Sequence, residues 1–336
     1  MKTALVTTTI NVPVVLKLYR ELGPDVKFFI ALDRNSDFTG VAQYPTDLLA
    51  SWLTPQFQEQ WKCSELIGWN CIQRRNLATL EALKWGAEVI VSIDDDNIPF
   101  DCYFDHIDHA FADPYNGLVA SNGSHVGNWF DVGRLLSPAA KHRGIPFEEN
   151  TLPRFAPITG ARIGVVAGVC LGDPDCDAIT RLAGQPDVHH TSELLRNGIV
   201  VERQTFTVFN SQNTAFLREL APAMFMIPHV GRYDDIFASI ICRRAMSDRK
   251  LYTHFGQPFV WQQRNPHKLM RDLKDEILGM EHVDEFARYV DRFPHPSDPL
   301  IPFLRELYDD LQHNGWWPQQ ASWAAFAWLD DCEQVM

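Results

Sequence analysis

Short apolar runs alternate along the first hundred residues with longer stretches whose apolar positions repeat at helical spacing. Three runs have the β-rich or continuously apolar character of strands in a parallel sheet: Thr3–Thr8, Lys27–Leu32 and Glu88–Ile93. Asn11–Glu21 and Gln73–Trp85 have the helical pattern, and Gly86 is a natural C-cap for the second. This alternation predicts a doubly wound α/β domain with a mostly parallel sheet, whose ligands bind at the carboxyl ends of the strands.

The rest of the chain has a less regular pattern. Residues 122–187 are rich in Gly, Pro and Asp, which predicts long loops around short strands. Val200–Phe209 has the pattern of a strand, and three segments have a helical period: Asp234–Met246, Leu269–Leu278 and Val283–Arg292. We expect one catalytic domain over residues 1–292. The Trp-rich helical tail over residues 293–336 is expected to pack on that domain or to join two copies of the chain.

Composition and charge exclude several classes of protein. With 336 residues, 46% hydrophobic and 22% charged, the chain has a globular composition. Its 43 acidic and 30 basic residues give a net charge of −13, which argues against nucleic acid or an anionic membrane as partner. No apolar run approaches the length of a membrane span, and no targeting segment is visible. The seven scattered cysteines never form CxxC, so we expect free thiols and a cytoplasmic location.

The strongest chemical signal is a triplet of acids, Asp94, Asp95 and Asp96, directly after the apolar strand. Adjacent carboxylates repel one another, so the triplet needs a counter-charge. In an extended segment Asp94 and Asp96 point to the same side, and carboxylate oxygens are the ligands that Mn²⁺ and Mg²⁺ prefer. The triplet therefore predicts a divalent-cation site that can hold a diphosphate. A solvated acidic turn is the alternative.

Polar residues on neighbouring elements can complete such a site. Arg75 and Asn76 lie on the preceding predicted helix, where Arg75 can pair with Asp94 or a phosphate oxygen and Asn76 can hold loop backbone. An ordinary surface arginine is the alternative for Arg75. Asp33 follows the second strand, where it can bind a ligand or cap a helix.

A second acidic pair, Asp234 and Asp235, follows Gly231-Arg232 and opens a predicted helix. Either carboxylate can act as a general base or bind sugar hydroxyls near the first site. The alternative is that both stabilise the helix N-terminus, one as a cap and the other through the helix dipole.

Together these features resemble the reversibly glycosylated polypeptides, the UDP-arabinopyranose mutases, which have a GT-A glycosyltransferase scaffold. The resemblance covers about residues 1–290, and its motifs occur in the family's order. Five stretches carry it: Ile93–Asp96, Leu171–Ala178, Asn213–Phe216, Gly231–Asp235 and Gly256–Trp261, the last followed by Asn265-Pro266 and Lys274–Glu276.

The resemblance implies a Mn²⁺- or Mg²⁺-dependent enzyme that acts on a UDP-sugar. In the mutases the sugar–phosphate bond is broken and remade while the ring contracts between pyranose and furanose. The implied metal ligands are Asp94 and Asp96. The residues implied to bind the nucleotide sugar are Thr8, Asp33, Arg75, Asn76, Asp95 and Arg162.

Two positions depart from the family pattern. In the mutases an arginine in a loop after the acidic strand becomes reversibly glycosylated, and here Arg154-Phe155-Ala156-Pro157 replaces the family's Arg-Gly-Tyr-Pro. Arg154 is therefore the candidate, with simple phosphate or carboxylate binding as the alternative. The family's Trp-His becomes Trp261-Gln262, and the nearby histidines are His254 and His267. His254 is the candidate third metal ligand, and an ordinary core or surface histidine is the alternative.

The leading prediction is a GT-A enzyme acting on a UDP-sugar, as a mutase or as a glycosyltransferase with Asp234 or Asp235 as base. A non-catalytic GT-A subunit that binds a partner through its tail is a third hypothesis. It is disfavoured because clustered carboxylates are costly without a function. A metal-dependent phosphohydrolase should carry more Asp and His ligands in tight motifs than this chain does.

Overall fold

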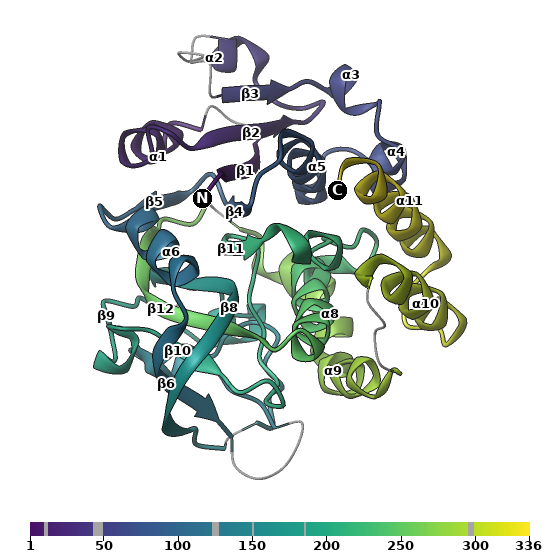
Figure 1. The fold of residues 1–336 in the computed structure, drawn as a ribbon. Helices are drawn as coiled ribbons and strands as arrows, with labels where there is room; N and C mark the ends of the chain where they lie inside the picture. Colours follow the sequence, from purple (N-terminus) through teal and green to yellow (C-terminus); the bar gives the residue numbers. More distant parts are fainter. Residues whose placement is uncertain are drawn as a thin grey trace.

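The computed structural model describes residues 1–9, 13–42, 50–122, 128–149, 151–184, 186–265, 267–294 and 299–336. Within these ranges the centre of the molecule is a ten-stranded sheet of order β3-β2-β1-β4-β11-β8-β6-β10-β12-β5 (Figure 1). Its strands are β1 (Thr3–Thr9), β2 (Lys27–Leu32), β3 (Ala50–Leu53), β4 (Val89–Ile93), β5 (Asn97–Pro99), β6 (Tyr115–Ser121), β8 (Arg154–Gly172), β10 (Ile199–Val201), β11 (Asn213–Leu217) and β12 (Leu251–Gln262). β7 (Leu136–Ser137) and β9 (His190–Thr191) form a separate ladder.

The sheet has a parallel half and a mixed half. β3, β2, β1 and β4 are parallel neighbours. β11 then pairs antiparallel with both β4 and β8, whereas β8 and β12 are parallel. Because β1, β2 and β4 run in one direction, their carboxyl ends meet at one edge of the sheet, which is where such sheets bind ligands.

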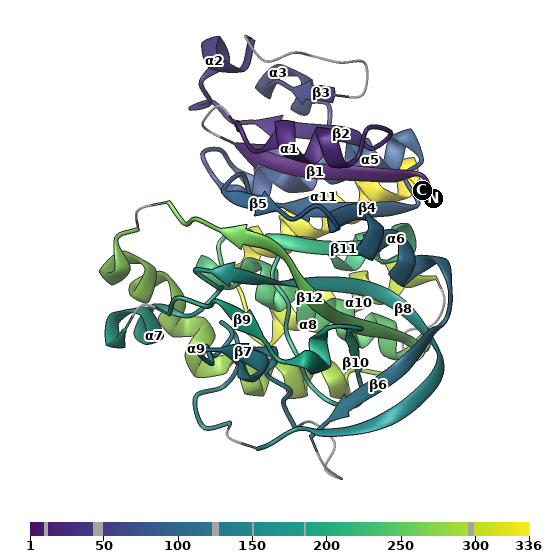
Figure 2. The same cartoon turned by 90° about the vertical axis from the view of Figure 1, so that its left-hand side faces the viewer.

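Helices cover both faces of the sheet. They are α1 (Leu16–Leu22), α2 (Phe38–Ala42), α3 (Pro55–Gln58), α4 (Cys63–Ile67), α5 (Arg75–Trp85), α6 (Tyr103–Ala112), α7 (Ala178–Ala183), α8 (Asp234–Asp248), α9 (Leu269–Arg292), α10 (Leu300–His313) and α11 (Gln319–Val335). The apolar sides of α1 and α6 pack in one core, and those of α5, α8, α10 and α11 in the other. Figure 2 shows α1 and α6 on the near side of the sheet and α10 and α11 behind it. The predicted doubly wound α/β fold with a helical C-terminal extension is confirmed.

The predicted elements of the first hundred residues are present, with small shifts at their ends. The strands become β1, β2 and β4, and the helix predicted from Gln73 becomes α5 after a 3₁₀ turn at Ile72–Arg74. The helix predicted for Asn11–Glu21 becomes α1, which begins at Leu16. Its first predicted residues, 11 and 12, lie outside the described ranges.

Three predictions for the later chain are wrong. Residues 122–187 contain β8, a 19-residue strand, whose exposed first half and glycines hide the alternation expected of a strand. The strand predicted for Val200–Phe209 is limited to β10. The two helices predicted between 269 and 292 are the single helix α9. Gly279 lies inside α9 at a point where a Cβ atom would overlap the ring of Tyr233. The glycine therefore allows α9 to pack closely against Tyr233.

The Trp-rich tail packs on the α/β domain. Trp328 on α11 is fully buried, stacks on Phe225 at 5.2 Å between ring centroids, and donates from Nε1 to the carbonyl oxygen of Pro222 at 3.0 Å. The carboxylate of Asp331 accepts from the backbone N–H of Cys63 at 2.9 Å, which joins α11 to α4. The domain boundary at residue 292 and the association of two copies remain predictions. Every helix in the described ranges is too short or too polar to cross a bilayer.

Candidate functional site

A cavity of ≈560 Å³ opens at the edge where β1, β2 and β4 end. Its other wall consists of the 3₁₀ turn η5 (Gly231–Tyr233), the start of α8 and the segment after β12. Eight of the predicted site residues line it: Thr8, Asp33, Arg75, Asp94, Asp95, Asp96, Asp234 and Asp235. The fold therefore joins the two acidic motifs, which are far apart in the sequence.

The acid triplet has a built-in counter-charge on one side. The Arg75 side chain is only 3% exposed, forms an ion pair with Asp94, and donates to the carbonyl oxygen of Ser211 at 2.8 Å. Asp95 accepts a hydrogen bond from Thr9 Oγ1 at 2.5 Å. Asp96 is less compensated, because its buried Oδ1 atom has no hydrogen-bond partner among the described residues. Burial, followed by the charges of Asp94 and Asp95, raises the pKa of Asp96 to about 6.

This donor set fits a hard divalent cation. In the described part of the chain no three His, Cys, Asp or Glu side chains converge as a ready metal cluster. The candidate metal ligands that the chain offers are therefore the two carboxylates of Asp94 and Asp96, which line the cavity. Mg²⁺ typically binds through one or two carboxylates together with substrate phosphates and water, and carboxylates suit Mn²⁺ as well. The unpartnered oxygen of Asp96 matches that requirement.

Arg143, which sequence reasoning missed, organises the opposite wall. Its Nε and Nη2 atoms donate to the two oxygens of Asp175 at 3.0 and 2.9 Å, and Nη2 also lies 3.1 Å from both oxygens of Asp235. Burial alone would raise the pKa of Asp175, but Arg143, together with the charges of His142 and Arg264, outweighs burial and holds that pKa well below its usual range. Paired and buried in this way, the three side chains form a fixed scaffold.

The sequence contained a signal for Arg143. The run Arg143-Gly144-Ile145-Pro146 is closer to the family's Arg-Gly-Tyr-Pro than the run that starts at Arg154. Gly144 has a φ of +91°, and a Cβ there would lie 2.6 Å from Ile236 Cγ2. Glycine is therefore required for this loop to pack against the start of α8.

The neighbours Asp234 and Asp235 have different environments. Asp235 accepts from the backbone N–H of Ser211 at 3.1 Å as well as from Arg143, so it is held in place by cationic and amide donors. Asp234 accepts from Gln73 Nε2 at 2.8 Å. Burial, and then the adjacent charge of Asp235, raises the pKa of Asp234 to about 7. A buried carboxyl group whose pKa is raised toward neutrality is typical of acid–base sites.

Arg264 is a second cation that sequence reasoning missed, although it immediately precedes Asn265. Its side chain is 10% exposed, and its Nε and Nη2 atoms have no hydrogen-bond partner within the described ranges. They lie 3.7 Å from Asp173 Oδ2 and 3.9 Å from Asp175 Oδ1, respectively. Those carboxylates already pair with Arg181 and Arg143. A partly buried guanidinium that lines a cavity and has unused donors is suited to an anionic ligand.

Four predicted site residues lie outside the cavity. Asn76 is buried on α5, where its amide exchanges hydrogen bonds with backbone atoms of Met226 at 2.9 and 3.1 Å. Arg154 is exposed at the first position of β8, a 19-residue strand whose other end is Gly172. Arg154 does not line the cavity. Arg162 is 67% exposed and lies 4.0 Å from Glu219. His254 is buried near the start of β12, whereas the other end of that strand, at Gln262, reaches the acids.

Comparisons with known proteins agree with the resemblance carried by the motifs. No family model matches the chain. Over 162 residues it is 27% identical to a probable UDP-arabinopyranose mutase 2 from Solanum tuberosum, a match that covers 46% of this chain and 41% of that protein. The chain thus spans less than half the length of this curated relative. The predicted resemblance to this family is confirmed.

Comparison with solved structures finds matches of low similarity. Glucosyl-3-phosphoglycerate synthase from Mycobacterium tuberculosis, in complex with Mn²⁺ and UDP-glucose, is 12% identical with a TM-score of 0.41, covering 88% of this chain and 80% of its own. Residues 1–349 of S. aureus TarS are 10% identical with a TM-score of 0.38, covering 100% of this chain and 90% of that chain. The α/β fold is defined by the strand order and strand pairing of the chain itself.

Proposed function

We propose that the chain is a divalent-metal-dependent enzyme of GT-A type that acts on a UDP-sugar. The observation that carries this proposal is the meeting, in one cavity at the carboxyl edge of the sheet, of the acid triplet, Asp33 and two arginines, the buried Arg143 and the partly buried Arg264. Carboxylates for a cation and guanidinium groups for phosphate oxygens are the requirements of a nucleoside-diphosphate site.

Residues at the ends of β1 and β2 form the part of the cavity that we propose binds the nucleoside. Asp33 is 1% exposed, and its oxygens accept from the backbone N–H groups of Arg34 at 2.6 Å and Cys71 at 3.1 Å. Thr8 Oγ1 donates to the carbonyl oxygen of Ala31 at 2.8 Å and can still accept a hydrogen bond. These fixed groups suit hydrogen bonding to a ribose or a base, in agreement with the position of Asp33 in the GT-A resemblance.

Charge balance supports a role for a metal ion in holding the diphosphate. The cavity contains seven aspartates and four arginines: Asp33, Asp94, Asp95, Asp96, Asp175, Asp234 and Asp235, with Arg75, Arg143, Arg232 and Arg264. A diphosphate adds further negative charge to this acidic excess. A Mn²⁺ or Mg²⁺ ion held by Asp94 and Asp96 would neutralise the diphosphate and stabilise its departure. Arg264 would donate to the phosphate oxygens from the β12 side.

The chemical step that we propose first is the mutase reaction, because the curated relative is a probable UDP-arabinopyranose mutase. The sugar leaves the diphosphate and returns to it after its ring has changed. The Arg143–Asp175–Asp235 scaffold would hold the wall that faces the sugar. A glycosyltransferase is the second candidate. It is supported by Asp234, whose raised pKa of about 7 suits a base that takes a proton from an acceptor hydroxyl.

One incubation distinguishes these reactions. UDP-arabinopyranose and UDP-glucose are each mixed with enzyme and Mn²⁺ but no acceptor, and the products are separated by anion-exchange chromatography. A furanose product supports the mutase, and slow release of UDP alone supports the transferase. Asp96→Asn should abolish either reaction, whereas the matched variant Asp101→Asn changes an exposed acid outside the cavity and should keep it. If wild-type protein neither converts a UDP-sugar nor binds UDP, the proposal fails in favour of a non-catalytic subunit.

We also propose a cytoplasmic location and a small-molecule UDP-sugar as the principal partner, with no nucleic acid or membrane surface. All seven cysteines are free, as expected of a reducing compartment. The net charge of −13 disfavours polyanionic partners. Association of two copies through the tail remains a proposal, and the 48% exposed Trp323 is the residue to test for it.

A further inference from the structure

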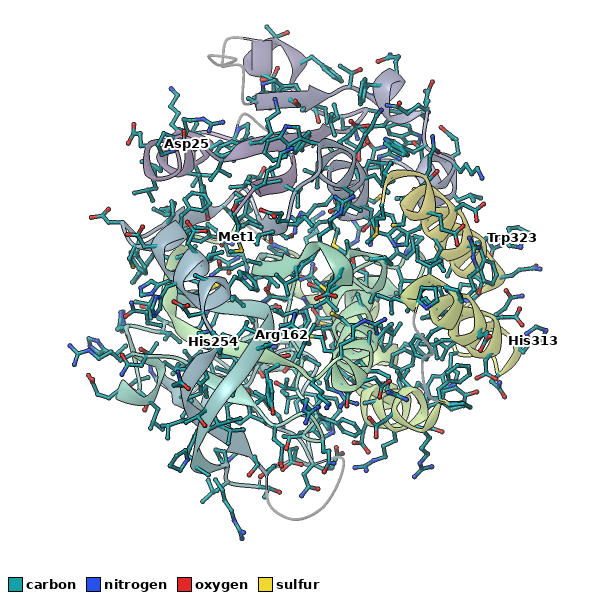
Figure 3. The ribbon with its side chains drawn as sticks, in the orientation of Figure 1. Met1, Asp25, Arg162, His254, His313 and Trp323 are labelled. Atoms are coloured by element: carbon teal, nitrogen blue, oxygen red, sulfur yellow. The ribbon has the colours of Figure 1, made fainter. Side chains whose placement is uncertain are left out.

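A second cavity of ≈690 Å³ lies away from the acid triplet and shares no lining residue with the first. It is bounded by α6, the start of β6, the 3₁₀ turn η3 (Glu193–Leu195) and β12. His254, which is labelled in Figure 3, is one of its lining residues. Its lining includes polar planar side chains and two aromatic rings: His106, His109, Asn116, Asn197, His254 and Gln257, with Tyr115 and Phe259. None of these residues has a part in the proposed reaction.

The wall around His254 is a built structure. The Tyr115 hydroxyl donates to the carbonyl oxygen of Gly198 at 2.6 Å and accepts from the backbone N–H of Leu118 at 2.9 Å. Gly198 has a φ of +72°, and a Cβ there would overlap the imidazole of His254. Glycine therefore lets the loop close directly over this ring.

An irregularity in β12 shapes the opposite side. The register between β12 and β8 shifts between Gly256 and Val260, so β12 has extra residues at this point. Gln257 and Phe259 lie in this bulge, and both line the cavity. Bulges of this kind redirect side chains and are over-represented next to binding sites.

His254 presents an unused acceptor in this wall. It is 7% exposed, and its Nδ1 atom has no hydrogen-bond partner in the part of the chain that the structure describes. Burial lowers the pKa of His254 to about 4, so the ring is neutral at physiological pH. With the proton on Nε2, which faces the backbone of Asn197 and Gly198, Nδ1 is an acceptor that lacks a donor. His254 therefore contributes a buried, neutral ring to the wall.

The charges around the cavity favour a neutral ligand. Glu193 and Arg196 lie 3.5 Å apart and compensate each other, which leaves Asp113 as the remaining formal charge among the lining residues. His106 Nε2 contacts the side-chain amide of Gln257, and its ring lies 5.3 Å from that of Phe259. Neither a strong anion nor a strong cation is therefore favoured, and no cluster of metal ligands exists within the described ranges.

We propose that this cavity binds a neutral saccharide, with Gln257 and Asn116 hydrogen-bonding to its hydroxyls and Tyr115 packing against a C–H face. Saccharide hydroxyls both donate and accept, which matches the side-chain amides. Aromatic rings provide the apolar surface that a sugar face needs. The volume is in the range of small-molecule sites. The proposal stands independently of the reaction in the first cavity.

The test uses saturation-transfer NMR with free D-glucose, D-galactose, L-arabinose and cellobiose, without nucleotide. Ala110→Trp fills the cavity from α6, because Ala110 lines it. Ala112→Trp is the matched control, since Ala112 is exposed on the same helix and does not line the cavity. Gln257→Ala is a milder variant that removes one hydrogen-bonding group without adding bulk. Circular dichroism and thermal melting report whether each variant is folded.

We expect at least one of these sugars to give a transfer signal with wild type and Ala112→Trp. The signal should vanish with Ala110→Trp and weaken with Gln257→Ala. Excess UDP with Mn²⁺ should leave the signal unchanged, which separates this site from the first. The proposal is overturned if none of the four sugars gives a signal with wild type, if UDP displaces the sugar, or if the signal persists in folded Ala110→Trp. If Ala110→Trp does not fold, an undiminished signal in Gln257→Ala overturns it.

Discussion

Replacing Arg264 by methionine tests whether the first cavity is built for an anion. The variant keeps most of the side chain's length and removes a guanidinium that is 10% exposed and has two nitrogens without hydrogen-bond partners in the described ranges. Hydrogen bonds to charged groups contribute about 1.5–3 kcal/mol. Loss of one such interaction should therefore weaken binding of UDP in the presence of Mn²⁺ by about 10- to 150-fold.

Folding stability should respond differently from binding. The nearest carboxylates, Asp173 and Asp175, keep their pairs with Arg181 and Arg143, so no buried acid loses its principal partner. Removal of an under-satisfied buried charge should leave the free energy of unfolding unchanged or raise it. Arg181→Met is the matched control, because it removes the partner of Asp173 and should destabilise the fold.

Calorimetric titration with UDP and Mn²⁺, combined with urea unfolding, measures both quantities. Arg264→Lys keeps a positive charge and should restore part of the affinity. If Arg264→Met binds UDP as tightly as wild type, Arg264 does not contact the diphosphate. If it loses affinity and stability together, the arginine has a structural role and the reasoning from its unpaired nitrogens is refuted.

Three further predictions concern other parts of the molecule. Burial and Asp235 raise the pKa of Asp234 to about 7, so transferase turnover should rise as the pH increases through that value. Asp234→Asn should abolish this pH dependence and slow turnover about 10²- to 10⁴-fold. The folded state holds this proton more tightly than the unfolded chain, so the stability of wild type relative to Asp234→Asn should fall from about pH 4 to about pH 7. Arg143→Met removes the bidentate partner of the buried Asp175 carboxylate. It should lower the free energy of unfolding, measured by urea titration, by about 3–5 kcal/mol. An unchanged urea midpoint would contradict a structural role for Arg143. Trp328→Ala should cost about 3–5 kcal/mol because the indole is fully buried, whereas Trp323→Ala, at 48% exposure, should stay within about 0.5 kcal/mol; equal effects in thermal melts would contradict the packing of the tail.

The parts of the fold that follow from local pattern were predictable. The β-rich or apolar runs of β1, β2 and β4 are buried on both faces, and their composition carries that information directly. β8 was missed because its burial depends on its neighbours: its residues up to Gly160 are mostly exposed, and only the later ones are covered. The sequence predicted two helices in place of α9. Gly279 lies inside α9 because of its close contact with Tyr233, and local helix propensity does not contain that information.

The candidate site was predictable where a motif stands at a strand end. Asp33 and the acid triplet follow buried strands, so their meeting at one edge follows from parallel pairing. Arg143 and Arg264 lie in irregular segments, and only the folded chain brings them to the same cavity. His254 shows the reverse: its residue type suited a metal ligand, but the length of β12 separates it from the acids and places it in the second cavity.

The most direct test of the central claim is calorimetric titration of UDP into the protein with Mn²⁺ and then with EDTA. If Asp94 and Asp96 hold a cation that binds the diphosphate, UDP should bind in the presence of Mn²⁺ and should not bind in EDTA. Asp96→Asn should bind no UDP even with Mn²⁺, while Asp101→Asn binds as wild type does. Binding that is equally strong in EDTA, or that survives in Asp96→Asn, would contradict the account.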